Sequence, residues 1–260
     1  MISVIRSGLA GVSQEIAVIS NNIANANSVG FKKSMASFND VYSEQVGLRP
    51  GVSSGLGISL TDPRRMHSQG SLKETGDALD LSIVGSGMFL LDTRESAGVL
   101  TYSRAGSFTV NSQGFVVNSE NISLLDKNQN PIKLPFNVSV DGKAAQKLTN
   151  VKVEPDGKIK ASYGTSEFLT IGQVALAKFA NETRLQSTGI GNFIETPESG
   201  TATVGNPKEL GFGLIQGGSL ENSNTDISTE LVRLIRAQQA FNGNAKMLEA
   251  EGKATDRLIG

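Results

Sequence analysis

The chain of 260 residues has no cysteine, and this absence narrows its chemistry more than any other feature of its composition. Without thiols it cannot form disulfide bonds, use a thiolate nucleophile or bind a metal through sulfur. Its single histidine, His67, has no second histidine or cysteine with which to complete a transition-metal site. We therefore expect no bound metal and no other cofactor.

A strong charge imbalance is also missing. Lys and Arg total 24 and Asp and Glu total 25, so the chain lacks the excess of basic residues that is typical of nucleic-acid-binding proteins. No apolar run approaches the roughly 20 residues of a membrane span. The N-terminus differs from a conventional signal peptide, because Arg6, Gln14 and Glu15 interrupt its apolar residues. We expect no nucleic-acid partner, no membrane span and, if the protein is exported, a route without a cleaved signal peptide.

Aromatic residues are few, with no tryptophan and 3 tyrosines, whereas glycine contributes 29 residues. Abundant glycine beside Asn, Ser and Thr favours turn-rich β structure over an α/β enzyme core. Apolar and polar residues alternate at 79–83, 107–110 and 151–154, and residues 155–157 are typical of a hairpin turn. We predict a mainly antiparallel β domain over residues 77–180. Extended connectors over residues 31–76 and 181–221 would flank it, with at most short strands between residues 46 and 76.

Both ends of the chain carry apolar residues at alternating steps of three and four, which is the heptad spacing of a helix that packs along other helices. The N-terminal seam consists of Ile2, Ile5, Leu9, Val12, Ile16, Ile19 and Ile23. The C-terminal seam runs over residues 227–259 and includes Leu231, Leu234, Phe241 and Leu248. Residues 223–226 offer an N-cap for the second helix, and residues 21–30 offer a stop for the first. We predict an α+β fold with helices over residues 1–30 and 222–260, paired as a coiled coil.

Packing against one partner helix gives a terminal helix with a heptad stripe only marginal stability. Burying its apolar residues contributes a free energy similar in size to the conformational entropy lost when the helix is ordered. A polymer offers contacts on several sides, because each subunit is surrounded by copies of itself. We predict that both seams form an assembly interface, and that Asn21, Asn22, Asn25 and Asn224 act as caps or as hydrogen-bond partners between subunits. The alternative is a soluble β-domain adaptor with a closed helical hairpin.

Motifs that resemble catalytic or binding sites are weak. Residues 51–55 match the G-x-S-x-G string of hydrolases, which would use Ser53 as nucleophile and His67 as base, but a glycine-serine linker is the better interpretation because no strong strand precedes it and no helix follows. Residues 126–130 resemble the start of a calcium loop, yet Pro131 replaces the glycine and Asn137 the glutamate, which favours a β-turn. Residues 85–87 and 211–213 lack the third glycine of a nucleotide-binding loop. We predict no catalytic residue and no enzymatic activity.

Several segments at both ends resemble a known family. Ser7-Gly8-Leu9, residues 21–25 and Gly30-Phe31-Lys32 are similar to the N-terminal signature of bacterial flagellar rod and hook proteins. Residues 220–224, 230–232 and 237–241 are similar to the C-terminal motif of that family. The resemblance covers about 40 residues at each end, and residues 67–72, 80–89 and 102–108 add weaker similarity in the middle.

The resemblance implies a structural subunit of the flagellar axial structure, in the basal body or the hook. Such a subunit is exported by the flagellar export apparatus and assembles with itself and with other rod and hook proteins. Its terminal helices would form an inner coiled-coil tube around a channel that transmits torque and passes export substrates, with the β domain outside. The chain length is similar to that of distal rod members, whereas Ser7-Gly8-Leu9 and residues 36–38 are similar to hook members. A proximal rod subunit is a further alternative.

Overall fold

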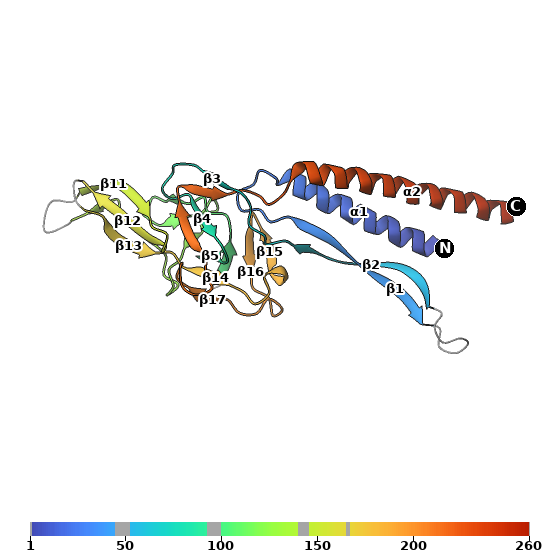
Figure 1. The fold of residues 1–260 in the computed structure, drawn as a ribbon, viewed down its shortest axis with the longest axis horizontal. Coiled ribbons are helices and arrows are strands. Elements are labelled where there is room, and N and C mark those ends of the chain that lie inside the picture. The colour runs from blue at the N-terminus through green and yellow to red at the C-terminus, as the bar shows by residue number, and fades with distance from the viewer. Residues whose placement is uncertain (1, 45–52, 93–99, 140–145, 165–166, 260) are drawn as a thin grey trace. The chain divides into compact units, whose positions relative to one another are not determined.

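The computed structural model describes residues 2–44, 53–92, 100–139, 146–164 and 167–259. The chain divides into two compact units. The helical unit consists of residues 1–26, 33–66 and 225–260, and the β unit consists of residues 27–32 and 67–224. Both long helices belong to the first unit and most strands to the second, so the protein is an α+β protein with a central, mostly antiparallel β domain (Figure 1).

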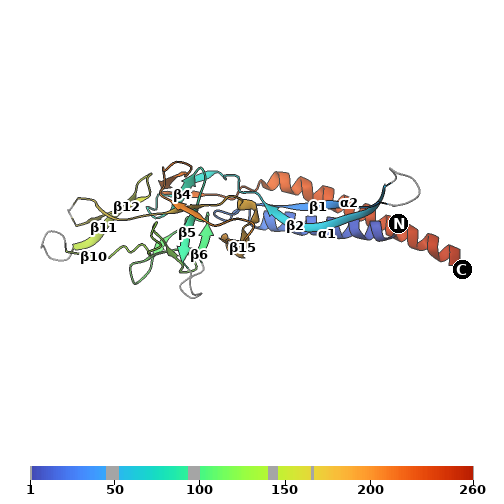
Figure 2. The same ribbon diagram turned by 90° about the horizontal axis from the view of Figure 1, so that it is seen from below.

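The helical unit is built on α1 (Ile2–Ala24) and α2 (Ile227–Ile259), which lie side by side in both views (Figures 1 and 2). α1 ends at Ala24, within the stretch of asparagines that begins at Asn21, and the backbone N–H and the side-chain Nδ2 of Asn25 both donate to the carbonyl of Asn21, at 3.1 and 2.9 Å. α2 begins after Asp226, whose Oδ1 accepts from the N–H of Thr229 at 3.0 Å, as an N-cap does. The helices are therefore shorter than the predicted ranges 1–30 and 222–260.

A long hairpin completes the helical unit and corrects the prediction of a connector with at most short strands. β1 (Ser34–Glu44) and β2 (Ser53–Arg65) pair in antiparallel fashion from Ser34 opposite Arg65 to Glu44 opposite Ser53. β2 contains the alternation Leu56, Ile58, Leu60, but glycine and serine stand between these residues. That composition is typical of loops, so it concealed a period of two that the sequence does contain.

The free edge of the hairpin lies along α1. The N–H of Ile58 donates to Ser7 Oγ at 3.3 Å, and Gln14 Nε2, one heptad further along α1, donates to the carbonyl of Thr61 at 3.4 Å. Gly11, between them, is buried beneath Ile58 and Phe38, and a side chain at that position would collide with the tip of Ile58. The polar face of α1 therefore satisfies part of a strand edge that would otherwise be unpaired.

The β unit contains a nine-stranded sheet, a four-stranded sheet and two strand pairs. The nine-stranded sheet comprises β5 (Met88–Asp92), β6 (Leu100–Ser103), β7 (Thr109–Val110), β8 (Val116–Val117), β9 (Ser123–Leu124), β14 (Leu176–Lys178), β15 (Gln186–Gly189), β16 (Asn192–Ile194) and β17 (Thr203–Gly205). The four-stranded sheet comprises β10 (Asn137–Val138), β11 (Gln146–Val153), β12 (Lys158–Tyr163) and β13 (Leu169–Gln173). β18 (Leu214–Gly217) pairs with β4 (Leu81–Val84), and β19 (Ser219–Glu221) pairs with β3 (Leu72–Glu74).

Five of these strands, β15 to β19, lie in residues 181–221, which the sequence predicts to be a connector. Each has only three or four residues, too few for an alternating pattern to be recognised. They form because distant strands supply partners, as β4 does for β18 and β6 for β16. The short 3-10 helix η1 (Glu182–Arg184) is the other regular element of this stretch.

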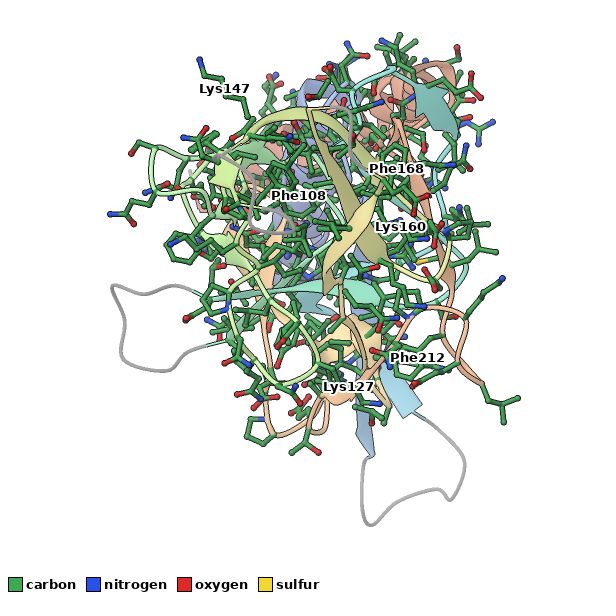
Figure 3. The ribbon with its side chains drawn as sticks, turned by 90° about the vertical axis from the view of Figure 1, so that its left-hand side faces the viewer. Phe108, Lys127, Lys147, Lys160, Phe168 and Phe212 are labelled. Carbon is green, nitrogen blue, oxygen red and sulfur yellow. The ribbon has the colours of Figure 1, made fainter. Side chains whose placement is uncertain are left out.

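The hydrophobic core of the β unit lies between its sheets and is well covered. Phe89 packs edge-on against Phe108, with ring centroids 5.2 Å apart, and Tyr102 packs edge-on against Phe179 at 4.7 Å. In the end-on view Phe108 lies among other side chains, whereas Lys147 of β11 points away from the unit (Figure 3). The two core clusters include Leu81, Ile83, Leu91, Leu124, Ile159, Tyr163, Leu176, Ile215, Met88, Leu90, Leu125 and Phe193.

Three turns of the same construction join the small strands of this unit. Asn111, Asn118 and Asp126 each accept two backbone N–H bonds through the side-chain Oδ1. Three residues later the backbone turns left-handed, at Gly114 in the first turn and, with φ of 62° in both cases, at Asn121 and Gln129 in the others. The β-turn interpretation of residues 126–130 is confirmed, because the Asp126 carboxylate is engaged with Asn128 and Asn130 of its own loop.

A buried ionic cluster joins the two segments of the β unit. The Glu221 side chain has no exposed surface, and its Oε1 accepts from Lys32 Nζ at 2.6 Å and from the N–H of Gly70 at 2.8 Å. Its Oε2 accepts from Arg104 Nη1 at 3.2 Å, and Arg104 Nη2 donates to the carbonyl of Gly85 at 2.7 Å. Burial lowers the pKa of Lys32, and the carboxylate of Glu221 opposes that shift.

Replacing Glu221 by Gln should lower the free energy of unfolding of the β unit by about 3–5 kcal/mol, because Lys32 and Arg104 would remain buried without their counter-charge. Urea unfolding of the purified chain measures the change. Glu198→Gln is the matched control, since the ion pair of Glu198 with Arg184 is largely exposed and its loss should change stability by less than about 1 kcal/mol. Equal effects of both substitutions would contradict the assigned role of Glu221.

Replacing Gln129 by Gly should raise stability by up to about 1 kcal/mol, because glycine adopts the left-handed conformation without steric cost. Asn121→Gly should give a smaller gain, since asparagine tolerates the same φ better than glutamine. Thermal unfolding of the two variants beside the parent chain provides the comparison. A lower melting temperature for Gln129→Gly would show that its side chain contributes more than its backbone costs.

Candidate assembly surface

The N-terminal seam is only partly covered within the chain. Ile19 is 3 % exposed and is the one seam residue of α1 that is fully buried, together with Gly11 and Asn22 from other positions. Ile2 is 43 % exposed. The remaining seam residues are half-buried, namely Ile5, Leu9, Val12, Ile16 and Ile23.

α2 meets α1 in antiparallel orientation through small and polar residues. Asn22 Nδ2 donates to Glu230 Oε2 at 3.2 Å, and a Cβ placed on Gly8 would lie 3.5 Å from Asn244 Nδ2. Fourteen residues separate the two contact positions on each helix, and Ala237, buried midway on α2, continues the same heptad position. The helices therefore approach closely along a line that offers little apolar surface.

The positions at which α2 meets α1, namely Glu230, Ala237 and Asn244, are not the predicted seam residues of α2. Leu234, Phe241 and Leu248 flank these positions and are half-buried, whereas Leu231 is 45 % exposed. Heptad spacing alone cannot distinguish two neighbouring stripes of one helix, because residues three and four apart occupy both. Leu231 instead belongs to an exposed stripe with Ile227 and Ile235, which recur every four residues.

Much of the apolar surface in the helical unit is left uncovered. Besides the stripe on α2, the β1–β2 hairpin and the N-terminus of α1 expose large apolar side chains by more than a third of their area. Monomeric proteins seldom expose so much apolar surface in a small region unless it has a partner. The uncovered apolar residues of the helical unit are Ile2, Val4, Met35, Phe38, Val41, Leu56, Leu60, Met66, Ile227, Leu231, Val232, Ile235 and Met247.

The four predicted asparagines have different surroundings. Asn22 is fully engaged within the chain, because its Oδ1 accepts from the N–H of Ser34 at 2.9 Å and its Nδ2 donates to the carbonyl of Ser34 and to Glu230. Asn25 bonds to Asn21 at the end of α1, and Asn224 Nδ2 donates to the carbonyl of Ser68 at 3.1 Å in the β unit. The side chain of Asn21 is exposed.

The heptad patterns did not single out two polar residues of the helical unit, Glu230 and Gln14. Glu230 is fully buried and accepts from both Asn22 and Arg233. Gln14 lines a hollow of about 350 Å³, and no hydrogen bond reaches its buried Oε1 from the described residues. Gln14 lies between the seam residues Val12 and Ile16 on another face of the helix, so the heptad pattern gave no signal for it. The hollow is lined by Gln14, Ala17, Val18, Asn21, Ser34 and Pro63.

The hydrolase hypothesis finds little support. Gly51, Val52 and the side chain of Ser53 lie outside the described residues, and β2 begins at Ser53, so the chain is not a linker from there on. His67 packs edge-on against the Phe193 ring, with centroids 5.5 Å apart. Among the described residues, no group of three or more His, Cys, Asp or Glu could hold a metal ion.

By length and composition alone, α1 is apolar enough to cross a membrane, with a mean hydropathy of 1.3 in its most apolar window of 18 residues. The apolar residues of α1 are periodic rather than consecutive, so no uninterrupted apolar run marks this helix. Contacts with α2 and β2 account for part of this apolar surface.

Three descriptions of protein families match the chain. "Flagella basal body rod protein" matches residues 2–32, "Flagellar hook protein FlgE/F/G D1 domain" matches residues 82–161, and "Flagellar basal body rod FlgEFG protein C-terminal" matches residues 216–260. The first and last cover the terminal helices, and the second covers a large part of the β unit. The order of the three matches follows the order of the elements along the chain.

Similar proteins agree with these matches. The flagellar basal-body rod protein FlgG of Caulobacter vibrioides is 34 % identical over 93 % of this chain and 91 % of its own length. FlgG of Agrobacterium fabrum is 32 % identical over 95 % of this chain and 93 % of its own length. The flagellar hook protein FlgE of Helicobacter pylori is 33 % identical, but over only 48 % of this chain and 17 % of its own. The similarity to rod proteins extends over nearly the whole chain, and this chain therefore belongs to the flagellar basal-body rod protein family, whose members are structural subunits and not enzymes.

Proposed function

We propose that this chain is a distal rod subunit that assembles with itself through its helical unit into a hollow helical tube. Near full-length similarity to rod proteins supports the rod, and the partial match to a hook protein makes the hook the weaker alternative. In this role the subunit transmits torque, contacts other rod and hook proteins, and lines a channel for export substrates. It reaches its site through the flagellar export apparatus, without a cleaved signal peptide.

The observation that carries the proposal is the contrast between the two units. The core of the β unit is closed, with Leu81, Phe89 and Leu124 fully buried. In the helical unit, Gly8 of α1 lies against Asn244 of α2, Ile19 and Ala237 are the fully buried apolar side chains of the two helices, and Leu234, Phe241 and Leu248 stay half-buried. The exposed apolar surface of the helical unit is what neighbouring copies would bury, at about 25 cal/mol for each Å² removed from water.

The proposed polymer places α1 and α2 in a coiled-coil layer with the helices of neighbouring subunits. Several seam residues are only half-buried within the chain, so part of their apolar surface is available to a second partner. They are Leu9, Val12 and Ile16 on α1 and Leu234, Phe241 and Leu248 on α2. Leu231 and the stripe around it would face a different neighbour from the one that α1 provides. Asn21 is exposed beside the hollow at Gln14, where a hydrogen bond from another subunit would meet a buried acceptor.

Replacing Val232 or Ile235 on α2 by Asp should prevent assembly while leaving the isolated subunit folded, because these side chains are 50 % and 54 % exposed within the chain. We expect the concentration needed for polymerisation to rise at least about tenfold, as each charge would be buried at an interface. Sedimentation velocity and electron microscopy of purified protein report the result. Gln239→Asp, at an exposed polar position of α2, is the matched control. Unimpaired assembly of Ile235→Asp would remove the stripe from the interface.

Backbone amides of α1 should exchange with solvent faster than those of β5 and β6 in dilute subunit, and should become protected on polymerisation. The reason is that α1 buries few side chains, whereas both strands lie in the closed core. Hydrogen exchange followed by mass spectrometry separates the two regions. Strong protection of both terminal helices at every dilution would favour the adaptor with a closed helical hairpin.

A further inference from the structure

The tip of the β15–β16 hairpin holds an apolar side chain in an unfavourable position. Ile190 has a φ of 48° and is 70 % exposed. A left-handed conformation is sterically costly for a β-branched residue, and an exposed isoleucine gains nothing from burial. Gly189 and Gly191 on either side also have positive φ, so the chain has glycine available for the turn and yet keeps isoleucine at its tip.

The hairpin tip is held firmly by the residues behind it. Ser103 Oγ donates to the carbonyl of Gly191 at 3.0 Å, and Thr188 Oγ1 donates to the carbonyl of Asn192 at 3.3 Å. β16 pairs with β6, and Phe193 in its centre is fully buried. The Ile190 side chain is thus presented in a defined place, which lowers the entropy lost when it enters a binding site.

A hollow of about 330 Å³ lies at the opposite end of β16. It is lined by Glu195, Thr196, Pro197, Gly200 and Thr201. Its wall is preformed, because the N–H of Thr196 donates to Ser199 Oγ at 2.9 Å and Ser199 Oγ donates to the carbonyl of Thr196 at 2.9 Å. A proline ring and threonine methyl groups suit an aliphatic side chain.

We propose that Ile190 of one copy inserts into the Glu195–Thr201 hollow of the next copy. The two surfaces lie on one chain, at opposite ends of β16, and the five residue steps from Ile190 to Glu195 span at most about 18 Å. A contact between two different surfaces of identical molecules is heterologous, and it produces an open helical polymer when the rotation between successive copies does not close into a ring. The tip at residues 188–191 carries no charge, as its insertion beside Glu195 requires.

The proposed occupant of the hollow is a second copy of this chain, because each molecule carries both the exposed Ile190 side chain and the Glu195–Thr201 hollow. The contact would lie in the β unit, separate from the exposed residues of the helical unit, so it adds a second layer of contacts to the proposed polymer. The inference rests on the proposed self-assembly. Its test must therefore separate loss of this contact from loss of assembly altogether.

The absence of native cysteine permits a direct cross-linking test in the full-length chain. A double variant with Ile190→Cys and Thr201→Cys should form a ladder of disulfide-linked multimers on oxidation of the polymer, because each molecule carries both halves of the contact. Mixing the two single variants should give a dimer that contains one of each. The control combines Thr201→Cys with Leu210→Cys, which is more exposed than Ile190 but lies on another loop, and should give no ladder.

The outcomes separate the two proposals. Polymer that forms normally but yields no more cross-linking than the control overturns the Ile190 contact and leaves the proposed function intact. Absence of polymer from the unmodified chain under every condition overturns both. A ladder that forms equally at dilutions where no polymer is present would reflect random collision and would also overturn the contact.

Replacing Ile190 by Asn provides an independent measurement. Asparagine suits a left-handed φ, so the melting temperature of the dilute subunit should stay the same or rise. The concentration required for polymerisation should increase about tenfold, because the apolar side chain is lost from the contact. A lower melting temperature with unchanged polymerisation would mean that Ile190 serves the fold of its own subunit.

Discussion

The β unit depends on one buried carboxylate. Glu221 receives hydrogen bonds from Lys32, Arg104 and the backbone of Gly70, residues that are far apart in the chain. Lys32 ends the short segment 27–32, and Glu221 lies near the end of the long segment 67–224, so their ion pair joins the two stretches from which the unit is made. Removing two cations and one anion from water is costly, and the cost is met only when every partner is in place. The cluster therefore selects one arrangement of these segments.

Backbone hydrogen bonds reinforce that arrangement. The N–H of Gly30 donates to the carbonyl of Glu221 at 2.7 Å, and the N–H of Asn224 donates to the carbonyl of Phe31 at 3.4 Å. Gly30 has a φ of 66°, and a side chain there would collide with the backbone of Arg104 and Ala105. Glycine is thus required by both conformation and space at this position. The family resemblance of Gly30-Phe31-Lys32 coincides with the residues that build this junction.

The helical unit follows the opposite principle. It contains long helices and a long hairpin, yet few of its side chains are fully buried, and polar groups such as Asn22 and Glu230 occupy its best-covered places. Their hydrogen bonds determine which surfaces meet, because a buried amide or carboxylate tolerates few alternative partners. The apolar surface remains on the outside. A subunit built in this way is suited to the structural role of its family, since its outer surface is available to other subunits.

Local patterns were sufficient for the elements whose signal lies within one stretch of chain. The heptad residues Ile16 and Ile19 indicated α1, the asparagines after residue 20 indicated its end, and alternation indicated β4, β7 and β11. Patterns were insufficient where a partner decides the structure. β2 contains an alternation separated by glycine and serine, and β15 to β19 are too short to show one. The heptad pattern grouped Leu231 with Leu234 and did not single out Ala237, yet Leu231 is exposed and Ala237 is buried, because a helix has several stripes and only the packing selects one.

Sequence alone therefore established the α+β class, the two terminal helices, the strand-rich middle and the family, because each is encoded in periodicity or in short motifs. The tertiary structure alone decided which helix stripe is covered, that residues 34–65 form a hairpin, and that Lys32, Arg104 and Glu221 share one site. It also revealed the strained Ile190, since neither a backbone angle nor an exposed fraction is visible in a string of residues. Contacts between distant residues depend on the packing of the whole chain, and no local pattern encodes them.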